Sequence, residues 1–337
     1  MRKMASIRKI DRIRPIEGAD AIECAVIGGW TVVIKKGEFT VGQLAVYCEI
    51  DSWIPTEIAP FLSKGKEPRE FEGVKGERLR TVKLRGQLSQ GLLLPLSEFS
   101  PFIEGDDVSE VFGIKRWEMA VPAQLAGQVR GNFPSEIPKT DQERVQNLVK
   151  EIDAAIESGL RFEVTEKLEG SSMTCYQIRG EFGVCSRNLD LKKDENNAFW
   201  KAAIADSIEE RMKEVDENWD FAIQGELIGP GIQGNIYKLK DIEFRVFDVY
   251  NIQEGRYLDP QARIDLIKRM GLKHVPVLFS NADLRSDLGL GNVEEIVAFA
   301  DGRSEIAQTG REGVVFKQTG GGMSFKAISN KYLLKSE

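Results

Sequence analysis

FEVTEKLEG, residues 162–170, is the stretch on which the interpretation of this chain depends. Apolar and polar residues alternate up to Glu166, as they do in a half-buried strand. The stretch then brings Lys167 to the strand end, three residues before Gly170, and a glycine lets the following backbone approach a ligand closely. We therefore expect the Lys167 ammonium to point into a cleft above a sheet, either as a nucleophile or as an ordinary polar residue.

The tetrapeptide Lys-x-x-Gly does not decide between these alternatives. It also begins at Lys83, Lys268 and Lys317, so its presence alone carries little weight. The order and placement of other motifs must distinguish Lys167 from these three further candidates.

The length and composition predict a soluble protein of two domains. A chain of 337 residues is long enough to form two hydrophobic cores. No apolar run approaches the length of a membrane span, and the charged N-terminus, residues 1–9, is not followed by the apolar segment of a signal peptide. We therefore expect a cytoplasmic protein without a membrane partner.

Cysteine and histidine usage excludes several kinds of site. The four cysteines form no C-x-x-C pair and His274 is the only histidine, so we expect no zinc site and buried, reduced thiols. If the protein is an enzyme, lysine, carboxylates and a bound metal must carry its chemistry.

The net charge of −7 is unevenly distributed along the chain. Residues 1–100 hold 16 lysines and arginines against 13 acidic residues, whereas the remainder holds 30 against 40. Such a basic run is either a solvated face or a surface that follows a phosphate backbone. The run in the first part contains Lys64, Lys66, Arg69, Lys75, Arg78, Arg80, Lys83 and Arg85.

Residues 1–115 predict a small closed barrel of the OB type. Strand-like runs separated by glycine turns fit such a barrel, and OB barrels often hold nucleic acid, although a fold alone assigns no function. Residues 116–139 lack periodicity and contain three prolines, so we interpret them as a linker. The strand-like runs cover residues 22–27, 31–34, 44–48, 80–84 and 91–96.

Residues 140–337 predict a second, α+β domain with antiparallel sheets. Thr140 to Glu143 has capping-box spacing, apolar residues follow at helical intervals, and Gly159 stands at the expected C-cap, which predicts a helix. A hairpin follows over 172–188, then a long helix over 194–219 and helices near 260–270 and 293–300. Further strands are expected over 221–229, 242–250, 311–317 and 323–329.

Together, the motifs of the second domain resemble those of the covalent nucleotidyltransferases, the superfamily of polynucleotide ligases and mRNA capping enzymes. No single motif is specific, but their shared order covers residues 162–331, nearly the whole domain. In chain order they are Lys167-x-x-Gly170, Ser186-Arg187-Asn188, Glu226 after a glycine, Phe244-Arg245-Val246-Phe247-Asp248, Glu312-Gly313-Val314-Val315 and Phe325-Lys326.

The resemblance implies that Lys167 attacks the α-phosphate of ATP, expels pyrophosphate and forms lysyl-AMP. The attacking amine must be unprotonated, so we expect nearby cations to lower its pKa, supplied by Lys326, Lys317 or a bound metal. By the same resemblance Lys326 contacts the α-phosphate and stabilises charge as it develops.

The resemblance also implies the ligands of a metal and of the ribose. Glu226 and Glu312 match acidic positions that hold Mg²⁺ or Mn²⁺ or its waters, and Mg²⁺ needs few protein carboxylates. Glu169 matches a position near the ribose or the metal. Arg187 matches an arginine that grips the ribose or the 5′-phosphate.

The adenine would be held mainly by apolar contacts. Phe247 would stack on one face of the base, and Val314 or Val315 would pack on the other, although each could instead be plain core. Glu166 would help to read the adenine edge. Lys317 completes the nucleotide-binding set together with Lys326.

Domain order favours one branch of the superfamily. DNA ligases and capping enzymes place an OB domain after the last-motif lysine, whereas here the candidate barrel precedes Lys167 and only residues 330–337 follow Ser329. This order resembles the RNA ligase family in which an N-terminal OB module precedes the adenylyltransferase domain. Many relatives have Lys-x-Lys in the last motif; here Ser324 takes the first place, so either one lysine suffices or Lys317 or Lys331 shares the role.

We therefore expect an ATP-dependent RNA ligase that joins a 3′-OH to a 5′-phosphate through lysyl-AMP and RNA-adenylate. Its expected role is RNA repair, with RNA, most simply a nicked duplex, as its partner, and it is expected to act as a monomer. One alternative is a DNA ligase or a capping guanylyltransferase, against which the missing C-terminal barrel weighs. A catalytically silent RNA-binding module is the other, against which the intact Lys167 and both acidic positions weigh.

Overall fold

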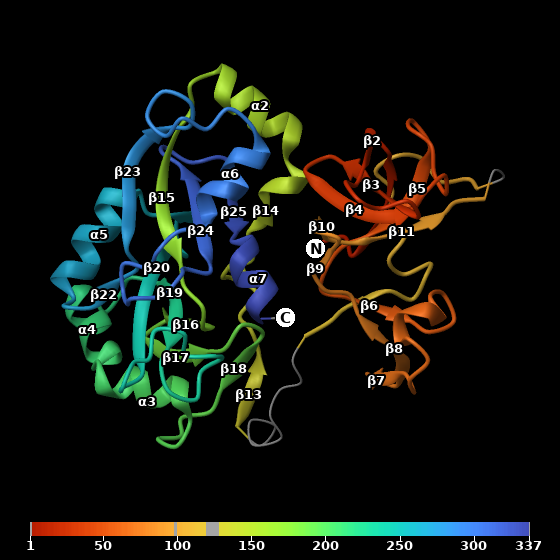
Figure 1. The fold of residues 1–337 in the computed structure, drawn as a ribbon. Helices are drawn as coiled ribbons and strands as arrows, with labels where there is room; N and C mark the ends of the chain where they lie inside the picture. Colours follow the sequence, from red (N-terminus) through yellow and green to blue (C-terminus); the bar gives the residue numbers. More distant parts are fainter. Residues whose placement is uncertain (1, 98–99, 119–127, 337) are drawn as a thin grey trace. The chain divides into compact units, whose positions relative to one another are not determined.

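The computed structural model describes residues 2–97, 100–118 and 128–336. Contacts between Cα atoms divide the chain into two compact units. The first unit comprises residues 1–120, 146–149 and 333–337, and the second comprises residues 121–145 and 150–332. The first is red to orange and most of the second is green to blue in Figure 1.

The first unit contains two short, three-stranded antiparallel sheets. One has the order β1-β5-β11 and the other β2-β3-β4. Ile7, Val46 and Cys48 of the first sheet are completely buried in the core. The strands are β1 (Ala5–Lys9), β2 (Arg12–Pro15), β3 (Ile22–Ile27), β4 (Trp30–Lys35), β5 (Leu44–Cys48) and β11 (Leu92–Pro95).

A long excursion between β5 and β11 carries the basic run. Its strands β6, β8 and β7 pair in that order, and β9 forms a separate hairpin with β10. A strand that follows β11 in the chain, β12, pairs with β6 at the edge of the first of these sheets. Sequence analysis predicted only a strand over 80–84 here, because charged residues and the turn at Glu72 and Gly73 obscure the alternation of β7 and β8. The elements are β6 (Ser52–Pro55), η1 (Pro60–Ser63), β7 (Arg69–Phe71), β8 (Val74–Arg78), β9 (Val82–Leu84), β10 (Gln87–Ser89) and β12 (Lys115–Arg116).

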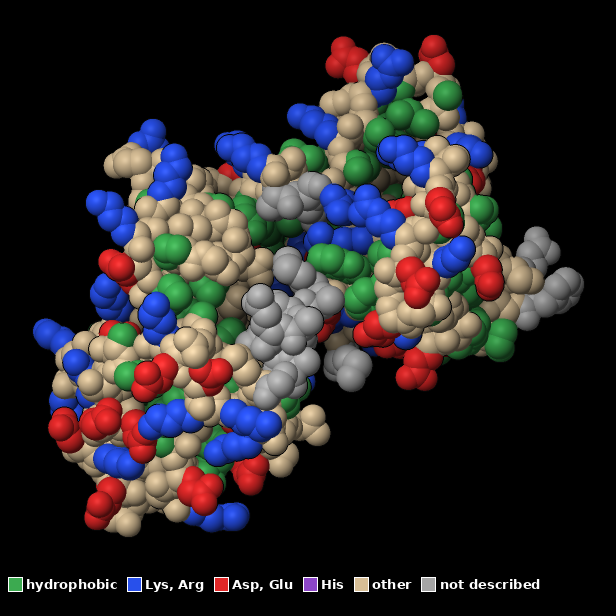
Figure 2. Space-filling model, turned by 90° about the horizontal axis from the view of Figure 1, so that it is seen from below, with side chains coloured by type: hydrophobic (Ala, Val, Ile, Leu, Met, Phe, Trp, Pro, Cys, Tyr) green, Lys and Arg blue, Asp and Glu red, His purple; other side chains and the backbone are tan. Residues whose placement is uncertain are grey.

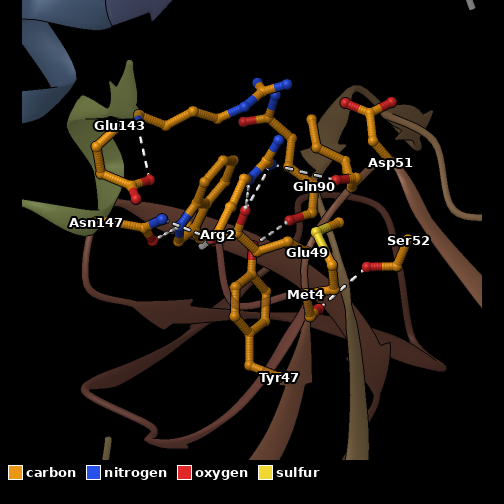
Figure 3. A network of polar contacts seen from close by, with 12 residues as sticks. Arg2, Met4, Tyr47, Glu49, Asp51, Ser52, Gln90, Glu143 and Asn147 are labelled. Atoms are coloured by element: carbon orange, nitrogen blue, oxygen red, sulfur yellow. Dashed lines mark hydrogen bonds and ion pairs between the residues drawn. The ribbon is translucent and has the colours of Figure 1, made fainter. Parts of the chain in front are cut away.

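Residues 146–149 belong to the first unit because Asn147 enters a polar network there (Figure 3). Its side-chain oxygen accepts hydrogen bonds from Trp30 Nε1 at 2.7 Å and Arg8 Nη2 at 3.0 Å. Its amide nitrogen donates to Glu49 Oε1 at 2.5 Å, and Arg2 Nε donates to Glu49 Oε2 at 2.6 Å. Both oxygens of the buried Glu49 carboxylate are therefore satisfied.

The second unit contains a large, mainly antiparallel sheet in the order β13-β18-β17-β16-β19-β20-β21, with β22 pairing parallel to β20. The helices α3, α4 and α5 cover one of its faces (Figure 1) and bury Trp200, Met212 and Ile267 against Ile223 and Phe244. The strands are β13 (Val129–Asn132), β16 (Ser171–Ile178), β17 (Glu181–Cys185), β18 (Leu189–Leu191), β19 (Phe221–Ile228), β20 (Glu243–Asn251), β21 (Arg256–Tyr257) and β22 (Lys273–His274).

A second sheet of this unit carries the stretch that contains Lys167. Its order is β14-β25-β24-β15-β23, and β14 pairs parallel to β25. Phe162, Phe316 and Phe325 pack their rings on one face, with centroid separations of 4.8 to 6.3 Å. The strands are β14 (Glu143–Arg144), β15 (Arg161–Lys167), β23 (Val277–Asp283), β24 (Gly313–Gln318) and β25 (Ser324–Ile328).

The helices of the structure begin and end close to local sequence signals. Asn197 caps α3, and Asn292 caps α6 by accepting the Glu295 N–H. Pro260 opens α5, where its missing N–H costs nothing. The helices are α2 (Val149–Glu157), α3 (Ala198–Ala205), α4 (Ile208–Val215), α5 (Pro260–Arg269), α6 (Val293–Ala300) and α7 (Asn330–Ser336), with η2 (Val145–Asn147) preceding α2.

Three expectations are corrected. The single helix over 194–219 is wrong: α3 and α4 are separated at Ser207, whose φ of 48° lies outside the right-handed helical region. The capping box at Thr140 does not start a helix, because residues 143–144 pair with β25 instead. Within the segment interpreted as a linker, 116–139, the described residues 129–132 form β13 by pairing with β18.

Other expectations agree with the structure. The four cysteines, which all lie in the described chain, are free and buried. Among the described residues, no helix is long and apolar enough to cross a membrane. Basic and acidic side chains are interspersed over the face shown in Figure 2. The fold class, a β-domain followed by an α+β domain with mainly antiparallel sheets, is as predicted.

Candidate active site

Lys167 is the last residue of β15 and pairs with Gly313 of β24. Its Nζ lies 2.8 Å from Glu312 Oε1, and its side chain is one-quarter exposed. Gly170 is required by packing: a Cβ there would clash with the Leu227 carbonyl oxygen and lie 2.9 Å from Glu226 Cγ. The glycine therefore brings the turn after Lys167 against β19, which carries Glu226.

Carboxylates dominate the surroundings of Lys167. Burial by itself lowers the pKa of Lys167, but Glu312 and Glu226 outweigh that effect, so the pKa is raised. Arg144 acts on Lys167 in the direction expected of a nearby cation, but more weakly than the two carboxylates. The expected contribution of Lys326, Lys317 or a bound metal stays a prediction. Without further positive charge, the amine is held protonated.

The three predicted acids lie close enough to influence one another. Burial raises the pKa of Glu226 to about 8, although Lys167 opposes this, and Glu312 and Glu169 reinforce it. Glu169 is buried and its pKa is raised mainly by burial. Its Oε1 accepts the Gly234 N–H at 2.7 Å, while Oε2 has no hydrogen-bond partner among the described residues.

These acids fit a hard divalent cation that keeps several of its waters. In the described part of the chain, no three carboxylate, thiol or imidazole groups are gathered as a ready-made metal cage. Mg²⁺ and Mn²⁺ prefer oxygen ligands, and Mg²⁺ commonly uses one or two carboxylates together with substrate phosphates. The unpaired Glu169 Oε2 and the half-buried Glu226 carboxylate are oxygen ligands that such an ion would need.

Strand register divides the predicted nucleotide-binding residues between two faces of the sheet. Thr165 pairs with Val315, and Val315 with Lys326, so these side chains share the face of Lys167. Glu166 pairs with Val314 on the opposite face, where Val314 is completely buried. Val314 is therefore wrong as a stacking residue, and Val315 is the valine that the structure places on the side of Lys167.

The Glu166 side chain is engaged away from Lys167. Its Oε2 accepts the Glu305 N–H at 2.8 Å, and its backbone N–H donates to the Pro276 carbonyl at 2.9 Å. Burial raises the pKa of Glu166. One oxygen of the Glu166 carboxylate is therefore already engaged by the backbone at Glu305, and the expected role of Glu166 at the adenine edge stays a prediction.

Lys317 is held beside Phe247 rather than beside Lys167. Its Nζ donates to the Phe247 carbonyl at 2.9 Å and to Asp248 Oδ1 at 2.7 Å, and lies 5.5 Å from the Phe247 ring centroid. Burial lowers the pKa of Lys317, and Asp248 opposes this shift. Lys317 thus holds the backbone of the predicted base-stacking residue. It also pairs with Ser324 in the register of β24 with β25, so a shared role with the last motif stays a prediction.

Behind Lys317 lies a closed buried ion pair. Arg263 Nη2 contacts both oxygens of Glu163 at 2.5 and 2.6 Å, and its Nε donates to His274 Nε2 at 3.0 Å. Burial lowers the pKa of His274 to about 4, which keeps the imidazole neutral. The only histidine of the chain therefore has a structural role in this cluster.

The segment 138–144 runs along the site and was missed by sequence analysis. Pro138 O accepts from Gln224 Nε2 at 2.8 Å, and Asp141 Oδ1 lies 2.5 Å from Arg187 Nη2. Arg187 also lowers the pKa of Glu226 from a distance, which places it at the same site. Gln142 Oε1 accepts a hydrogen bond from Ser324 Oγ, which occupies the first-lysine position.

Arg144 at the end of this segment is a further candidate site residue, and no local sequence signal points to it. It is buried, pairs with Lys326 in the parallel register of β14 with β25, and acts on Lys167. That register joins residues far apart in the sequence, so neither periodicity nor a short motif could have predicted it.

Comparison with known proteins identifies the family. A model of the RNA ligase family matches residues 160–331, and an OB-fold domain model matches residues 4–96. No curated protein sequence matches the chain.

Solved structures of Naegleria gruberi RNA ligase are similar over the whole chain. The form with PPi is 47% identical, with a TM-score of 0.90, covering 99% of this chain and 98% of that one. A mutant with AMP and Mn is 46% identical, with a TM-score of 0.91 and complete coverage of both chains. A mutant with ATP and Mn is 46% identical, with a TM-score of 0.90, covering 99% and 100%. The protein therefore belongs to the RNA ligase family, as its ordered motifs predicted.

Proposed function

We propose that this chain is an ATP-dependent RNA ligase that joins RNA 3′-OH and 5′-phosphate ends through lysyl-AMP and RNA-adenylate. The observation that carries the proposal is the Lys167 amine, which lies 2.8 Å from Glu312 and whose pKa is raised by Glu312 and by the half-buried Glu226. Support comes from relatives of similar fold described with ATP and Mn, with AMP and Mn, and with PPi.

In the first step the Lys167 nitrogen attacks the α-phosphorus of ATP. An N–P bond forms, and the P–O bond to pyrophosphate breaks, so pyrophosphate leaves with the electron pair. The ammonium must first lose a proton, and Glu312 Oε1 is the acceptor within hydrogen-bond distance. Lys326 would stabilise negative charge on the phosphate, a role that its position on the same face of the sheet as Lys167 supports.

A divalent cation, Mg²⁺ or Mn²⁺, would be held by Glu226, Glu312 and Glu169. When bound, it would offset the carboxylate charge that keeps Lys167 protonated and would screen the phosphates. Glu226 must deprotonate to serve as a ligand, and burial opposes that in the absence of a cation. Phe247 and Val315 would hold the base, and Arg187 would hold the ribose or the 5′-phosphate.

The remaining steps transfer the adenylate and then release it. An oxygen of the RNA 5′-phosphate attacks the phosphorus of lysyl-AMP and forms a P–O bond, while the N–P bond breaks and the Lys167 amine leaves with the electron pair and takes up a proton. The 3′-hydroxyl then attacks the 5′-phosphorus, AMP leaves, and the hydroxyl proton is lost. We place the protein in the cytoplasm as a monomer that repairs nicked RNA duplexes, with residues 1–115 holding the RNA.

Incubation with α-labelled ATP and Mn²⁺ tests this function directly. The label should become covalently attached, and subsequent addition of a nicked RNA duplex should discharge it and seal the nick. GTP should not label the chain, because efficient labelling by GTP would favour a capping guanylyltransferase. A 3′-deoxy terminus at the nick should abolish sealing, whereas a 2′-deoxy terminus sealed as fast as RNA would favour a DNA ligase.

A further inference from the structure

Some of the cations in the basic run from Lys64 to Arg85 form ion pairs with acidic residues. Arg78 Nη2 lies 2.6 Å from Asp51 Oδ1, and its guanidinium stacks 4.1 Å from the Trp117 ring. Two weaker pairs, Arg69 with Glu77 and Lys75 with Glu67, lie at 3.8 Å. These three cations are paired with acidic residues of the same unit, so not every charge of the run is available to bind a ligand.

The hairpin of β9 and β10 presents charge without such partners. Lys83 and Arg85 are exposed, and within the described residues neither forms a hydrogen bond or an ion pair through its side chain. The sequence from residue 78 to residue 97 contains no aspartate or glutamate. The hairpin therefore forms a purely basic surface within an acidic protein.

The same hairpin exposes apolar side chains. Val82 and Leu84 are 42% and 43% exposed, and both lie on β9, which pairs only with β10 among the described strands. Strand alternation places them on the face opposite to Lys83. An exposed apolar pair flanked by unpaired cations suits a ligand that offers both apolar surface and negative charge.

The hairpin is held firmly to the sheet of β2, β3 and β4. Thr31 Oγ1 donates to the Leu88 carbonyl at 3.0 Å, and the Val33 N–H donates to Ser89 Oγ at 2.9 Å. Arg85 and Gly86 form its turn with φ of 47° and 82°, the positive values that a tight two-residue hairpin turn requires. Hydrogen bonds to the sheet thus hold β10 in place, and β9 is attached to the sheet through β10.

We propose that the β9–β10 hairpin binds the RNA duplex beside the break, an inference that rests on the proposed ligase function. An A-form duplex offers a wide, shallow minor groove lined with riboses and bordered by phosphates. Val82 and Leu84 pack on the ribose faces, and the long side chains of Lys83 and Arg85 reach the bordering phosphates past the open edge of β9 and the turn. Free phosphate or nucleotide would not satisfy the apolar pair, which is why the proposal commits to a duplex.

The test compares two variants of the full chain that lose the same charge. Lys83→Gln with Arg85→Gln removes the hairpin cations, and Lys64→Gln with Lys66→Gln removes exposed cations of the same run outside the hairpin. Binding to a fluorescent nicked RNA duplex with a 3′-deoxy terminus is measured over a range of salt concentrations. The slope of log K against log salt should fall in magnitude by about 2 in the hairpin variant, because each lost phosphate contact removes about 1.

The control variant should keep most of the wild-type slope. An equal loss in both variants, or an unchanged slope in the hairpin variant, overturns the proposal. Lysine adenylylation is measured in parallel and should match wild type in both variants. If wild type itself fails to become adenylylated, the proposed function fails instead, so the two failures are distinguishable.

The apolar contact is tested separately with Val82→Ser and Leu84→Ser combined. This variant should bind the nicked RNA duplex more weakly by several-fold at every salt concentration while its slope stays that of wild type. Unchanged affinity would overturn the ribose contact, since serine removes most of the apolar surface but no charge. Thermal unfolding of each variant checks that the hairpin anchors at Leu88 and Ser89 remain intact.

Discussion

The two units each contain a buried polar cluster, and the clusters differ in how completely their carboxylates are satisfied. In the first unit, Glu49 accepts from Asn147 and Arg2 at 2.5 and 2.6 Å, one donor for each oxygen (Figure 3). In the second unit, Glu169 has one satisfied oxygen and one without a hydrogen-bond partner in the described chain.

The difference shows which cluster is built for stability and which for a ligand. A buried carboxylate with matched donors offsets its desolvation within the protein. Burial instead raises the pKa of Glu226 to about 8, so this group keeps a desolvation cost that a cation would relieve. Perturbed groups of this kind concentrate at functional sites, and here they surround Lys167.

The largest effect on activity should come from substituting a carboxylate in the cluster around Lys167. Glu226→Gln should slow lysine adenylylation by at least about 100-fold, the loss typical when one group that stabilises transition-state charge is removed. Folding stability should be unchanged or slightly higher, because a neutral amide replaces a carboxylate that burial disfavours. Single-turnover labelling with α-labelled ATP and thermal unfolding measure the two quantities. A destabilised variant with normal labelling would reverse the comparison.

Substituting Glu49 in the polar network of the first unit should instead lower stability and leave adenylylation nearly unchanged. Glu49→Ala leaves the Arg2 guanidinium, with 11% of its side chain exposed, and Asn147 without their carboxylate. The free energy of unfolding should fall by about 2–4 kcal/mol, as it does when one partner of a largely buried pair is removed. Denaturant titration measures this loss. Adenylylation by the folded fraction should stay within about twofold of wild type, because Glu49 belongs to the first unit.

Metal binding at the cluster around Lys167 should release a proton, and the amount released should depend on pH. Glu226, with a pKa raised to about 8, is mainly protonated at pH 7 and must lose its proton to bind a cation. Mn²⁺ addition should therefore release close to one proton per chain at pH 7 and far less at pH 9, and affinity should rise with pH between them. A pH indicator in weak buffer measures the release. Equal release from Glu226→Gln would assign the proton to another group.

The smallest expected effect concerns the last motif. Ser324→Ala removes the hydrogen bond to Gln142 and should lower the free energy of unfolding by about 1 kcal/mol. Adenylylation should change little, because Lys326 remains on the face of Lys167. A loss of labelling as large as that of Glu226→Gln would show that position 324 acts directly in the chemistry.

Local sequence signals were sufficient to predict that Lys167 lies near Glu226 and Glu312. Lys167, Glu226 and Glu312 each stand on or beside a strand with clear alternation, so motif order predicted their meeting. The motif alone predicts that Val314 or Val315 packs on the adenine, because only the strand register shows which face of the sheet each valine occupies. Strand pairing with Thr165 and Lys326 shows that Val315 faces the site.

What sequence analysis missed depends on contacts between distant residues. Arg144 is placed by a parallel pairing with Lys326, and its neighbours imitate a capping box. Ser207 interrupts a helical pattern through its backbone conformation, which the apolar stripe does not record. The raised pKa of Lys167 likewise arises from Glu312 and Glu226, which only the fold brings to it.

The identity of the adenylylated residue is the most direct test of the account. The full chain is incubated with ATP and Mn²⁺, digested, and the adducts are located by tandem mass spectrometry. The account predicts one adenylate, attached to the Lys167 side chain, and none in Lys167→Ala. An adduct on Lys83, or labelling that persists in Lys167→Ala, would contradict it.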